Sequence, residues 1–482
     1  MKKLTDAAAL LELSRDAGLA SILPRVAYRA DTEEDVAAAL GEAAGEGLPV
    51  TPRGAGTGIP TQSVGRGAIL LQDRAAAEVR SGQVVCEPGI VKAELNRVLA
   101  GSGAWMPVDP SSYASCTVGG MVANNSSGVR TVKYGSTVDY VEGLRVAVVG
   151  EGVSAKAAVP VGEGVSLPGK DGRAVSLILE NRRLISEDER KVTKNSSGYR
   201  LEKVIHDGKA DLSKLFAGSE GTLGVVTQAA LRTSPKPEGR LLFVVEASIE
   251  GLGGAASAFR GLGPSALELV DKSVFRVMGK WDRISKYSRS EDPYLIFCEF
   301  DGVGDDPSSR VEEVAESRAA SFDPMVLSSG SEIAQAWDAR NETLTLAQDI
   351  RKGSKVLVPG VEDLVAPPER LGDLVRLLVG EFEKRGLEYI MYGHAGDANL
   401  HARPLMDPSG PEGRRAIEGL MEDCFEGVWR LGGSITGEHG DGMLRAKFVE
   451  RQYPKSYWIM QELKQLYDPR GLLNPGVKVV SA

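Results

Sequence analysis

Cysteine is scarce in this sequence, and its scarcity argues against several kinds of protein. The 482 residues include four cysteines, which lie far apart and form no CxxC pair: Cys86, Cys116, Cys298 and Cys424. Zinc ribbons and iron–sulfur clusters need cysteines at short spacings, so neither is encoded here. A disulfide framework is also disfavoured, which fits a reducing compartment.

Long hydrophobic runs and targeting signals are missing as well. No apolar run approaches the roughly 18–20 residues that cross a bilayer. Lys2 and Lys3 open the chain, but charged residues such as Asp6 and Glu12 interrupt any signal-peptide core. We therefore expect a cytoplasmic protein with no transmembrane segment, and peripheral contact with a membrane stays open.

Blocks of positive charge are also absent. The formal net charge is −9, and acidic and basic residues are mixed along the chain. Without a basic stripe, nucleic acid is not an expected partner. An acidic chain repels a small anion at long range, so a carboxylate substrate would need positive charge within the site, from arginine or a metal ion.

The patterns that are present predict a mixed α/β chain of two or three domains. Before residue 233 we expect a helix from the Asp31–Glu34 capping box to about residue 47, another at 91–99, and strands at 48–51, 69–72, 84–87 and 144–149. Residues 233–239, which include Pro235 and Pro237, are the best domain boundary. Beyond them, strands at 241–249, 266–270, 295–300, 389–394 and 399–406, with a helix at 368–385, predict an antiparallel sheet with helices on one face.

Glycine-rich loops are the first functional signal. Gly54, Gly56 and Gly58 follow a short strand, where backbone N–H groups can surround a phosphate; an ordinary tight turn is the alternative. The segment is neither a GxGxxG fingerprint nor a P-loop. Three further segments, at 107–128, 194–199 and 218–224, are rich in small and hydroxyl residues. Four such loops in one domain predict a single large ligand with phosphates and a heterocycle.

These segments resemble a known family. The PRGAGTG loop, the DPSS…TVGGMVANNSSG run and the GSEGTLGVVT segment match, in order and spacing, the FAD-binding domain of vanillyl-alcohol oxidase-type (PCMH-type) flavoproteins. The resembled branch contains D-lactate dehydrogenases, D-2-hydroxyglutarate dehydrogenases and glycolate oxidase flavin subunits, and the resemblance runs from about residue 20 to the C-terminus. It implies an α+β fold: a PCMH-type FAD-binding domain at 1–234, a ferredoxin-like cap domain at 235–432 and a C-terminal segment at 433–482 that packs on the FAD domain.

The resemblance also implies which residues hold FAD. No histidine occurs in the first two loops, and Cys116 alone is weak evidence for a covalent link, so we expect non-covalent FAD. The residues expected at the cofactor are Pro52, Arg53, Gly54, Ala55, Gly56, Thr57, Gly58, Pro110, Ser111, Thr117, Gly119, Gly120, Asn124, Ser126, Ser127, Gly128, Tyr134, Glu220, Gly221, Gly224, Val225, Val226 and Asn474.

Histidine is the second functional signal. Only four histidines occur, and three of them, His394, His401 and His439, lie in two short glycine-rich motifs. The turn 396–398 would let the first two imidazoles converge, and Glu438 adds a carboxylate. Two imidazoles and a carboxylate suit zinc, manganese or iron, whereas hydrogen-bonded turn residues are the structural alternative. His206 lies outside these motifs.

In metal-dependent members of the resembled branch, the HxGDxNxH pair and the glutamate of GEHG bind the ion. Carried onto this chain, the resemblance implies His394, His401 and Glu438 as metal ligands and His439 as the catalytic base, with Asp397 and Asn399 in support. Ala398 stands where many relatives have glycine.

Arginine is the expected clamp for a substrate carboxylate, because its fork is bidentate. Three candidates are Arg340 in a WDAR segment, Arg403 two residues beyond His401, and Arg445 after the GEHGDG loop; a surface salt bridge is the alternative for each. Val361 stands where many relatives carry lysine, so substrate preference cannot be copied from them.

The expected reaction is oxidation of a D-2-hydroxy acid such as D-lactate, D-2-hydroxyglutarate or glycolate, with hydride transfer to the flavin. The GEHGDGMLRAKF and HARP details resemble the flavin half of fused enzymes with a C-terminal iron–sulfur domain, which this sequence lacks. We expect a separate acceptor: an iron–sulfur subunit, an electron-transfer flavoprotein or a quinone. Three alternatives stay open: a non-catalytic FAD-binding subunit, a metal hydrolase, and a flavin oxidase of another alcohol class. A homodimer is also left open.

Overall fold

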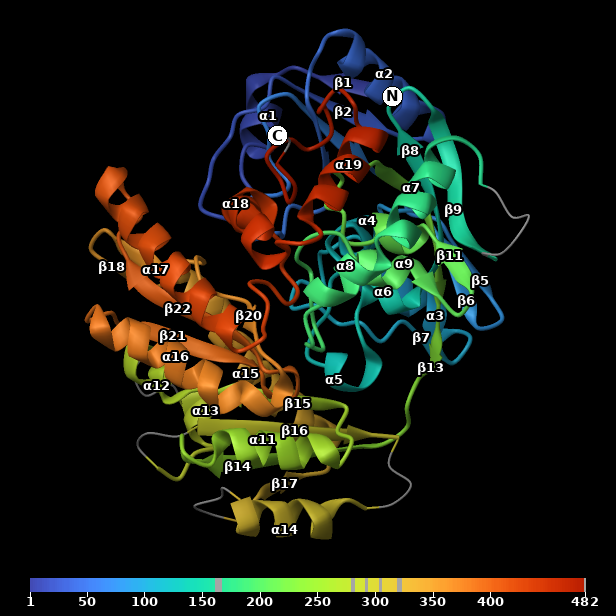
Figure 1. Ribbon diagram of the computed structural model, residues 1–482. Helices are drawn as coiled ribbons and strands as arrows, with labels where there is room; N and C mark the ends of the chain where they lie inside the picture. Colours follow the sequence, from blue (N-terminus) through green and yellow to red (C-terminus); the bar gives the residue numbers. More distant parts are fainter. Residues whose placement is uncertain (161–166, 279–281, 291–293, 303–305, 319–322, 481–482) are drawn as a thin grey trace.

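The computed structural model describes residues 1–160, 167–278, 282–290, 294–302, 306–318 and 323–480. Figure 1 shows two lobes. The N-terminal half of the chain, blue to green, forms one lobe, and the yellow and orange segments form the other. The last helices, in red, return to the first lobe.

The first lobe is built on two sheets. The smaller has the order β1-β2-β4-β3, with β2 and β3 parallel to β4: β1 (Lys2–Leu4), β2 (Val26–Ala30), β3 (Val50–Arg53) and β4 (Ala68–Gln72). The larger is antiparallel with the order β10-β11-β9-β8-β12-β6-β5: β5 (Ala77–Arg80), β6 (Gln83–Cys86), β8 (Val141–Val148), β9 (Gly152–Pro160), β10 (Ile205–His206), β11 (Lys209–Asp211) and β12 (Val225–Arg232).

Helices cover these sheets. They are α1 (Ala7–Glu12), α2 (Glu33–Gly45), α3 (Lys92–Ala100), α4 (Val118–Asn124), α5 (Thr131–Tyr134), α6 (Thr137–Tyr140), α7 (Gly169–Glu180), α8 (Arg182–Asp188), α9 (Leu201–Val204) and α10 (Ser213–Phe216). Helix α2 shows why they form. The Thr32 side chain caps its first turn, and Val36, Ala39, Leu40 and Ala43 make an apolar stripe buried against strands of both sheets.

The chain leaves the first lobe through β13 (Ser234–Pro235), which pairs with β7 (Ala104–Trp105). The expected boundary at residues 233–239 falls on this crossing. The domain limits at 234 and 432 themselves stay a prediction.

The second lobe contains one large antiparallel sheet, as expected. Its main path is β17-β14-β16-β15-β21-β22-β19-β18, and β20 pairs with β22. The strands are β14 (Arg240–Ala247), β15 (Ala266–Val270), β16 (Tyr294–Asp301), β17 (Met325–Leu327), β18 (Arg351–Lys352), β19 (Lys355–Leu357), β20 (Leu364–Val365), β21 (Tyr389–His394) and β22 (Asn399–Met406).

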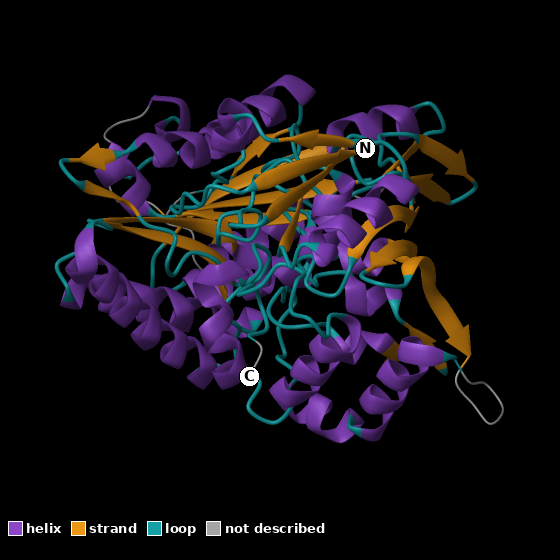
Figure 2. Cartoon of the chain, turned by 90° about the horizontal axis from the view of Figure 1, so that it is seen from above, coloured by secondary structure: helices purple, strands orange, loops and turns teal. Residues whose placement is uncertain are grey.

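Helices cover both faces of this sheet, which corrects the expectation of helices on one face. Phe243 and Val245 pack with one helical layer, whereas Leu242 and Val244 pack with the other. The first layer is α11 (Leu252–Gly261), α14 (Ser308–Arg318), the short helix η1 (Pro368–Arg370), α16 (Leu371–Lys384) and α17 (Gly410–Arg430); the second is α12 (Lys272–Met278), α13 (Asp282–Ser285) and α15 (Gly330–Asp349). Figure 2 shows helices on both sides of the long strands.

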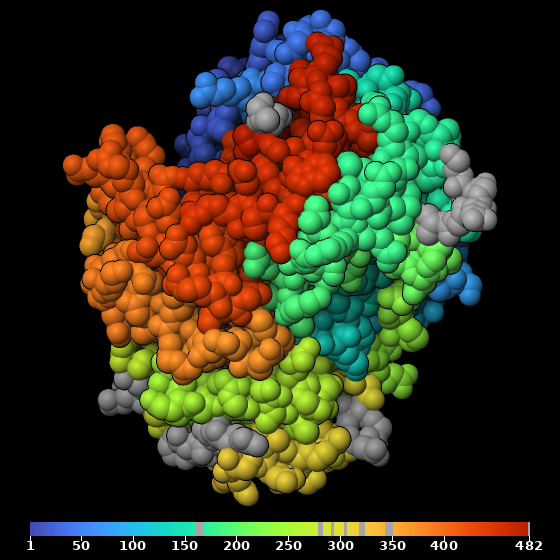
Figure 3. All heavy atoms as spheres, viewed as in Figure 1, coloured from blue at the N-terminus to red at the C-terminus, as the bar shows by residue number. Residues whose placement is uncertain are grey.

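The C-terminal segment joins the two lobes. Helices α18 (Gly442–Gln452) and α19 (Tyr457–Tyr467) follow the second lobe, which we call the cap. Val449, Leu463 and Tyr467 belong to the core of the first lobe. Leu473 then lies beside Val50 of β3. Figure 3 shows this red segment in contact with blue, green and orange surfaces. No helix among the described residues is long and apolar enough to span a membrane.

Candidate active site

A groove crosses the first lobe where its loops meet. Its lining comes from four segments: the end of β3 with the loop after it (52–59), residues 110–112, residues 116–127 around α4, and residues 219–226, which end in the first residues of β12. Within the described part of the chain, the backbone amides of residues 54–58 donate to no protein acceptor. Consecutive free amides at a glycine-rich turn form a cradle for an anion such as a pyrophosphate.

Close contacts between these loops require glycine. A Cβ at Gly54 would lie 2.5 Å from Thr117 Oγ1, and one at Gly119 would lie 2.5 Å from Pro88 Cβ. Gly221 has φ +71°, and its Cβ would lie 2.9 Å from Pro52 Cγ. The glycines therefore let separate backbone segments approach one another along the groove.

Most of the residues expected at the cofactor line this groove. They are Pro52, Arg53, Gly54, Ala55, Gly56, Thr57, Gly58, Pro110, Ser111, Thr117, Gly119, Gly120, Asn124, Ser126, Ser127, Glu220, Gly221, Gly224, Val225 and Val226.

Three expected cofactor residues lie elsewhere. Gly128 lines a second cavity, and Tyr134 donates its hydroxyl to Asp301 of the cap. Asn474 is buried and donates to the carbonyls of Gln62 and Glu220, so it supports the loops from behind.

The sequence predicted that the segment 194–199 faces the same ligand, and the structure corrects this prediction. None of its residues lines the groove. The segment is fully buried against the loop that carries Glu438, because Ser196 and Lys194 hydrogen-bond to that loop.

A second cavity, of about 670 Å³, lies between the cap and the first lobe. His394, His401, Arg340 and Arg403 line it. Glu438 and His439 line both this cavity and the groove, so the two spaces meet at these side chains.

The two cap histidines and Glu438 converge as the sequence predicted. His394 ends β21 and His401 lies in β22, and the turn η2 (Ala395–Asp397) joins the strands. The Nε2 atoms of the two imidazoles are 3.2 Å apart, and each lies 3.2 Å from Glu438 Oε1. Ligands about 2.0–2.2 Å from one tetrahedral ion lie about 3.4 Å from one another, so the spacing and chemistry of this set fit a divalent cation.

The two oxygens of Glu438 have different surroundings. Oε1 faces the histidines, whereas Oε2 accepts from Ser127 Oγ at 2.9 Å and from Lys194 Nζ at 3.0 Å. Burial alone would raise the pKa of this carboxyl, but the charges of Lys194 and His394 hold it well below its usual value. Glu438 is therefore an oriented, charged carboxylate.

Asp363 shapes the loop that carries Glu438 and His439. Its buried carboxylate accepts from the backbone N–H of Glu438 and, at 2.8 Å, from that of His439. Asn399 donates to the same carboxylate at 3.0 Å. The expected support from Asn399 thus reaches the loop through Asp363.

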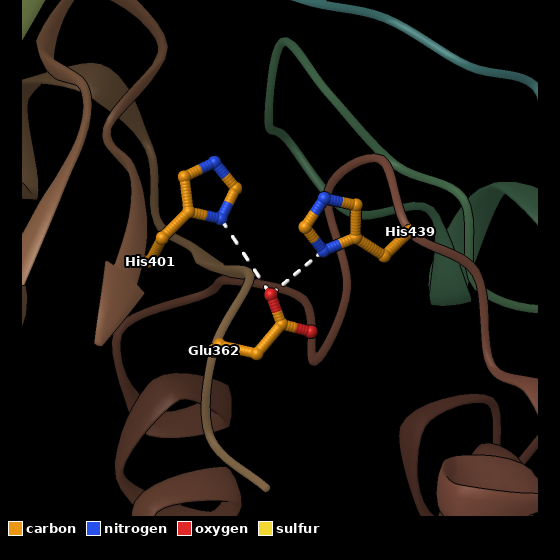
Figure 4. Close-up of side chains that lie close together, drawn as sticks. All are labelled: Glu362, His401 and His439. Carbon is orange, nitrogen blue, oxygen red and sulfur yellow. Dashed lines mark hydrogen bonds and ion pairs between the residues drawn. The ribbon is translucent and has the colours of Figure 1, made fainter. Parts of the chain in front are cut away.

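His439 and His401 both point toward Glu362 (Figure 4). His439 Nδ1 lies 2.7 Å from Glu362 Oε2, and His401 Nδ1 lies 3.7 Å from it. Burial alone would lower the pKa of His439, but Glu362, Asp363 and Glu438 together raise it to about 9. A cation beside Glu438 would oppose this rise by repulsion.

His394 has a similar partner. Its Nδ1 lies 2.6 Å from Glu268 Oε1, and the other oxygen of Glu268 pairs with Arg340. Burial alone would lower the pKa of His394, and the Glu268 carboxylate raises it above its ordinary value.

The three candidate arginines have different places. Arg403 lines the second cavity, and its Nε atom is buried with no hydrogen-bond partner among the described residues. Arg340 also lines the cavity but pairs with Glu268. Arg445 lines neither space: it is fully buried and donates to Glu362 and Gly440, which corrects its assignment as a substrate clamp.

Besides Asp363, four polar residues of this centre were not identified as site residues from the sequence. Glu362 and Glu268 each hold a histidine, Lys194 holds Glu438, and Tyr392 lies between Arg340 and His401 in the cavity wall. Glu268 is a lone charged residue within the apolar strand Ala266–Val270, and that was the available signal for it.

Two family models match this chain. Residues 24–156 match the FAD binding domain, and residues 238–477 match the C-terminal domain of FAD linked oxidases. Together they span both lobes and the loops that carry the histidines.

The chain is also similar to several curated proteins. It is 28% identical to the glycolate oxidase subunit GlcD of Bacillus subtilis, over 89% of this chain and 83% of that protein. It is 28% identical to a D-lactate dehydrogenase of Archaeoglobus fulgidus, over 94% and 91%. It is 29% identical to a D-2-hydroxyglutarate dehydrogenase of Pantoea ananatis over 97% of this chain, and it spans 49% of that longer protein.

A solved structure of alkyldihydroxyacetonephosphate synthase has the same fold, with a TM-score of 0.67 over 98% of this chain and 82% of that one, at 16% identity. The fold and the groove, together with the matched domains, define an FAD-dependent oxidoreductase. The chain belongs to the FAD-linked oxidases, as the resemblance predicted.

Proposed function

We propose that this enzyme is a dehydrogenase that oxidises a D-2-hydroxy carboxylate to the 2-oxo acid, with FAD in the groove and the substrate in the second cavity. The observation that carries the proposal is the position of Glu438 and His439, which line both spaces. A substrate carbon beside these two side chains would therefore lie next to a ligand in the groove.

The binding roles follow from the contacts. The free amides of residues 54–58 suit the FAD pyrophosphate, and the residues that line the groove would hold the cofactor non-covalently. His394, His401 and Glu438 would hold a zinc, manganese or iron ion. Arg403 would bind the substrate carboxylate, because its guanidinium is buried in the cavity wall with Nε unpaired.

When bound, FAD supplies a two-electron acceptor, and the cation supplies a positive charge beside the substrate hydroxyl. His439 takes the hydroxyl proton as the carbon–oxygen double bond forms. Its Nδ1 is engaged by Glu362, and its Nε2 lies 3.6 Å from Glu438 Oε1, on the side of the ligand set. The proton acceptor and the binding groups thus face the same small volume.

Anaerobic bleaching of the flavin tests the proposal. D-lactate, D-2-hydroxyglutarate, glycolate and longer 2-hydroxy acids would each be mixed with the FAD-loaded enzyme, with L-isomers as controls and with and without a chelator. We expect at least one D-2-hydroxy acid to bleach the flavin and the chelator to slow it. If no 2-hydroxy acid bleaches the flavin, the proposed substrate class is wrong.

Substitution of His439 tests the proton acceptor. We expect His439→Ala to keep its yellow colour and to lose roughly 10²–10⁴-fold in the rate of bleaching. Normal bleaching by the variant would remove His439 from the mechanism.

The electron acceptor is proposed to be a separate iron–sulfur subunit, an electron-transfer flavoprotein or a quinone. Slow reoxidation of the reduced flavin by oxygen is expected. Rapid peroxide formation would instead make the protein an oxidase.

A further inference from the structure

Two buried Arg–Glu–His contact series end at the candidate active site. In one, Arg340 pairs with Glu268, which contacts His394; in the other, Arg445 pairs with Glu362, which contacts His439. Arg340 and Arg445 are the largest fully buried side chains among the described residues. Burying a guanidinium and a carboxylate is costly, so each pair needs many compensating contacts to persist.

In the contact series that ends at His439, hydrogen bonds fix each side chain. Glu362 has no exposed surface, and its Oε1 accepts from Arg445 Nη2 at 2.7 Å. Arg445 also donates to the Glu362 carbonyl at 2.7 Å and to the Gly440 carbonyl at 2.9 Å. Oε2 is thereby fixed 2.7 Å from His439 Nδ1. The position of Glu362 leaves one direction for the hydrogen bond, from Nδ1–H to the carboxylate.

We propose that Glu362 is a positioning residue: anchored by Arg445, it accepts the Nδ1 hydrogen of His439 and so directs Nε2, the nitrogen that would accept the substrate proton, toward the substrate. The inference rests on the proposed function, in which His439 accepts the substrate proton. A neutral imidazole carries its one hydrogen on either nitrogen, and only one of the two forms can accept a proton at Nε2. Without a fixed acceptor at Nδ1, both forms would be populated.

The same atoms could be considered as a second cation site. Glu362, His401 and His439 offer ligand atoms within 4.8 Å of one another. Two observations disfavour this. The 2.7 Å between Nδ1 and Oε2 is a hydrogen-bond distance, and Arg445 already places a positive charge on Glu362. Arg403 Nη2 lies 3.9 Å from Glu362 Oε2 and adds a second positive charge.

The substitution Glu362→Gln gives a sharp test because the donors around it are fixed. Arg445 can only donate, so the glutamine oxygen must turn toward Arg445 and its NH₂ group toward His439. His439 Nδ1 then becomes the acceptor, and the hydrogen moves to Nε2. Size and packing are nearly unchanged, but the lone pair no longer faces the substrate.

Selective ¹⁵N labelling of histidine reads this directly. The chain has only four histidines, so the imidazole nitrogens of the full-length, FAD-bound, zinc-supplemented protein give few signals. In the unchanged chain we expect His439 to carry its hydrogen on Nδ1, and in Glu362→Gln on Nε2. The variant should keep its FAD and zinc and lose roughly 10²–10⁴-fold in flavin reduction.

Two further variants separate positioning from general damage. Glu362→Asp keeps an acceptor, so we expect the hydrogen to stay on Nδ1 and most of the rate to return. Glu388→Gln removes an exposed carboxylate that pairs with Lys352 and lines neither the groove nor the cavity, and we expect neither the His439 signals nor the rate to change. Glu268→Gln should alter the signals of His394 and leave the His439 hydrogen on Nδ1.

Three results would overturn the positioning role. One is that the His439 hydrogen stays on Nδ1 in Glu362→Gln. Another is that Glu362→Gln reduces its flavin as fast as the unchanged enzyme. The third is that the unchanged enzyme binds two equivalents of zinc and Glu362→Gln binds only one, which would make Glu362 a ligand of a second cation. If no 2-hydroxy acid reduces the unchanged enzyme, the proposed function fails, and the hydrogen position on His439, measured without substrate, decides the positioning role alone.

Discussion

At the residue scale, the two carboxylate oxygens of Glu438 contact different sets of side chains. Oε1 faces His394 and His401, while Ser127 and Lys194 of the first lobe hold Oε2. The carboxylate therefore contacts side chains of both lobes. The contacts at Oε2 orient it, so they affect how strongly a group binds at Oε1.

Lys194→Met tests this coupling. The change leaves Oε2 of a buried carboxylate without its cation, so we expect metal affinity to fall roughly 10–100-fold, as for other partners of metal ligands. Titration with a buffered zinc series measures it. Lys191→Met, three residues away and with its side chain 74% exposed, should leave the affinity unchanged. Equal affinities for both variants would mean that Lys194 only fills space.

Arg403→Met tests the substrate clamp. A hydrogen bond to a charged group contributes about 1.5–3 kcal/mol, so KM should rise roughly 10–150-fold. Because His439 is untouched, kcat should fall much less than kcat/KM. Steady-state kinetics on the best 2-hydroxy acid checks both, with the exposed Arg376→Met as control. A lower kcat at constant KM would place Arg403 outside carboxylate binding.

The residues that the sequence revealed and those that it hid differ in how local their partners are. His394, His401 and Glu438 are recognisable because each lies in a short motif whose turn is part of the pattern. Glu362 and Glu268 are not, because their meaning depends on His439 and His394, which arrive from distant segments. The Arg445 assignment was wrong for the same reason, since its carboxylate partner is 83 residues away.

At the scale of elements, the cap sheet shows why the second helical layer was missed. Strand β16 carries Glu299 and Asp301, which in a sequence indicate a face toward water. Both are buried in the structure, where Glu299 pairs with Arg130 and accepts from Trp337, and Asp301 pairs with Lys133. Side chains of the first lobe and of α15 satisfy these carboxylates, and alternation alone cannot foresee such partners.

The loop after β3 gives a prediction at the same scale. Gly54→Ala would place a Cβ 2.5 Å from Thr117 Oγ1, the atom that caps α4 by accepting from the Gly120 N–H. Loss of such a cap costs about 1–2 kcal/mol, so we expect FAD to bind roughly 5–30-fold more weakly. Equilibrium dialysis of the flavin measures this.

Gly41→Ala is the matched control for the loop. Gly41 lies in α2 with nothing within 4 Å of its added Cβ. Alanine there should raise stability by about 0.5–1 kcal/mol and leave FAD affinity unchanged. If Gly54→Ala also bound FAD normally, the tight approach of the loop to α4 would not matter for the cofactor.

At the scale of the whole molecule, the C-terminal segment connects the groove to the loop that carries Glu438 and His439. Lys478 has no exposed side-chain surface and lies 3.0 Å from carboxylate oxygens of both Glu220 and Asp441. Glu220 lies in the groove wall, and Asp441 follows His439 by two residues. Glu220 also accepts from the backbone N–H groups of Asp441 and Gly442. One cation thus holds two carboxylates at the junction of the lobes.

Lys478→Met should therefore affect both stability and catalysis. Removing one partner of a buried ionic set leaves uncompensated charge and costs about 3–5 kcal/mol of unfolding free energy. Denaturant unfolding followed by flavin release measures it, and Lys3→Met, which breaks an exposed pair with Glu42, should leave the free energy of unfolding nearly unchanged. Because Glu220 and Asp441 would lose the cation that holds them together, the loop that carries Glu438 and His439 should be held less firmly, and bleaching should also slow while FAD stays bound. Equal losses of unfolding free energy in Lys478→Met and Lys3→Met would show that only the packing of α19 joins the C-terminal segment to the lobes.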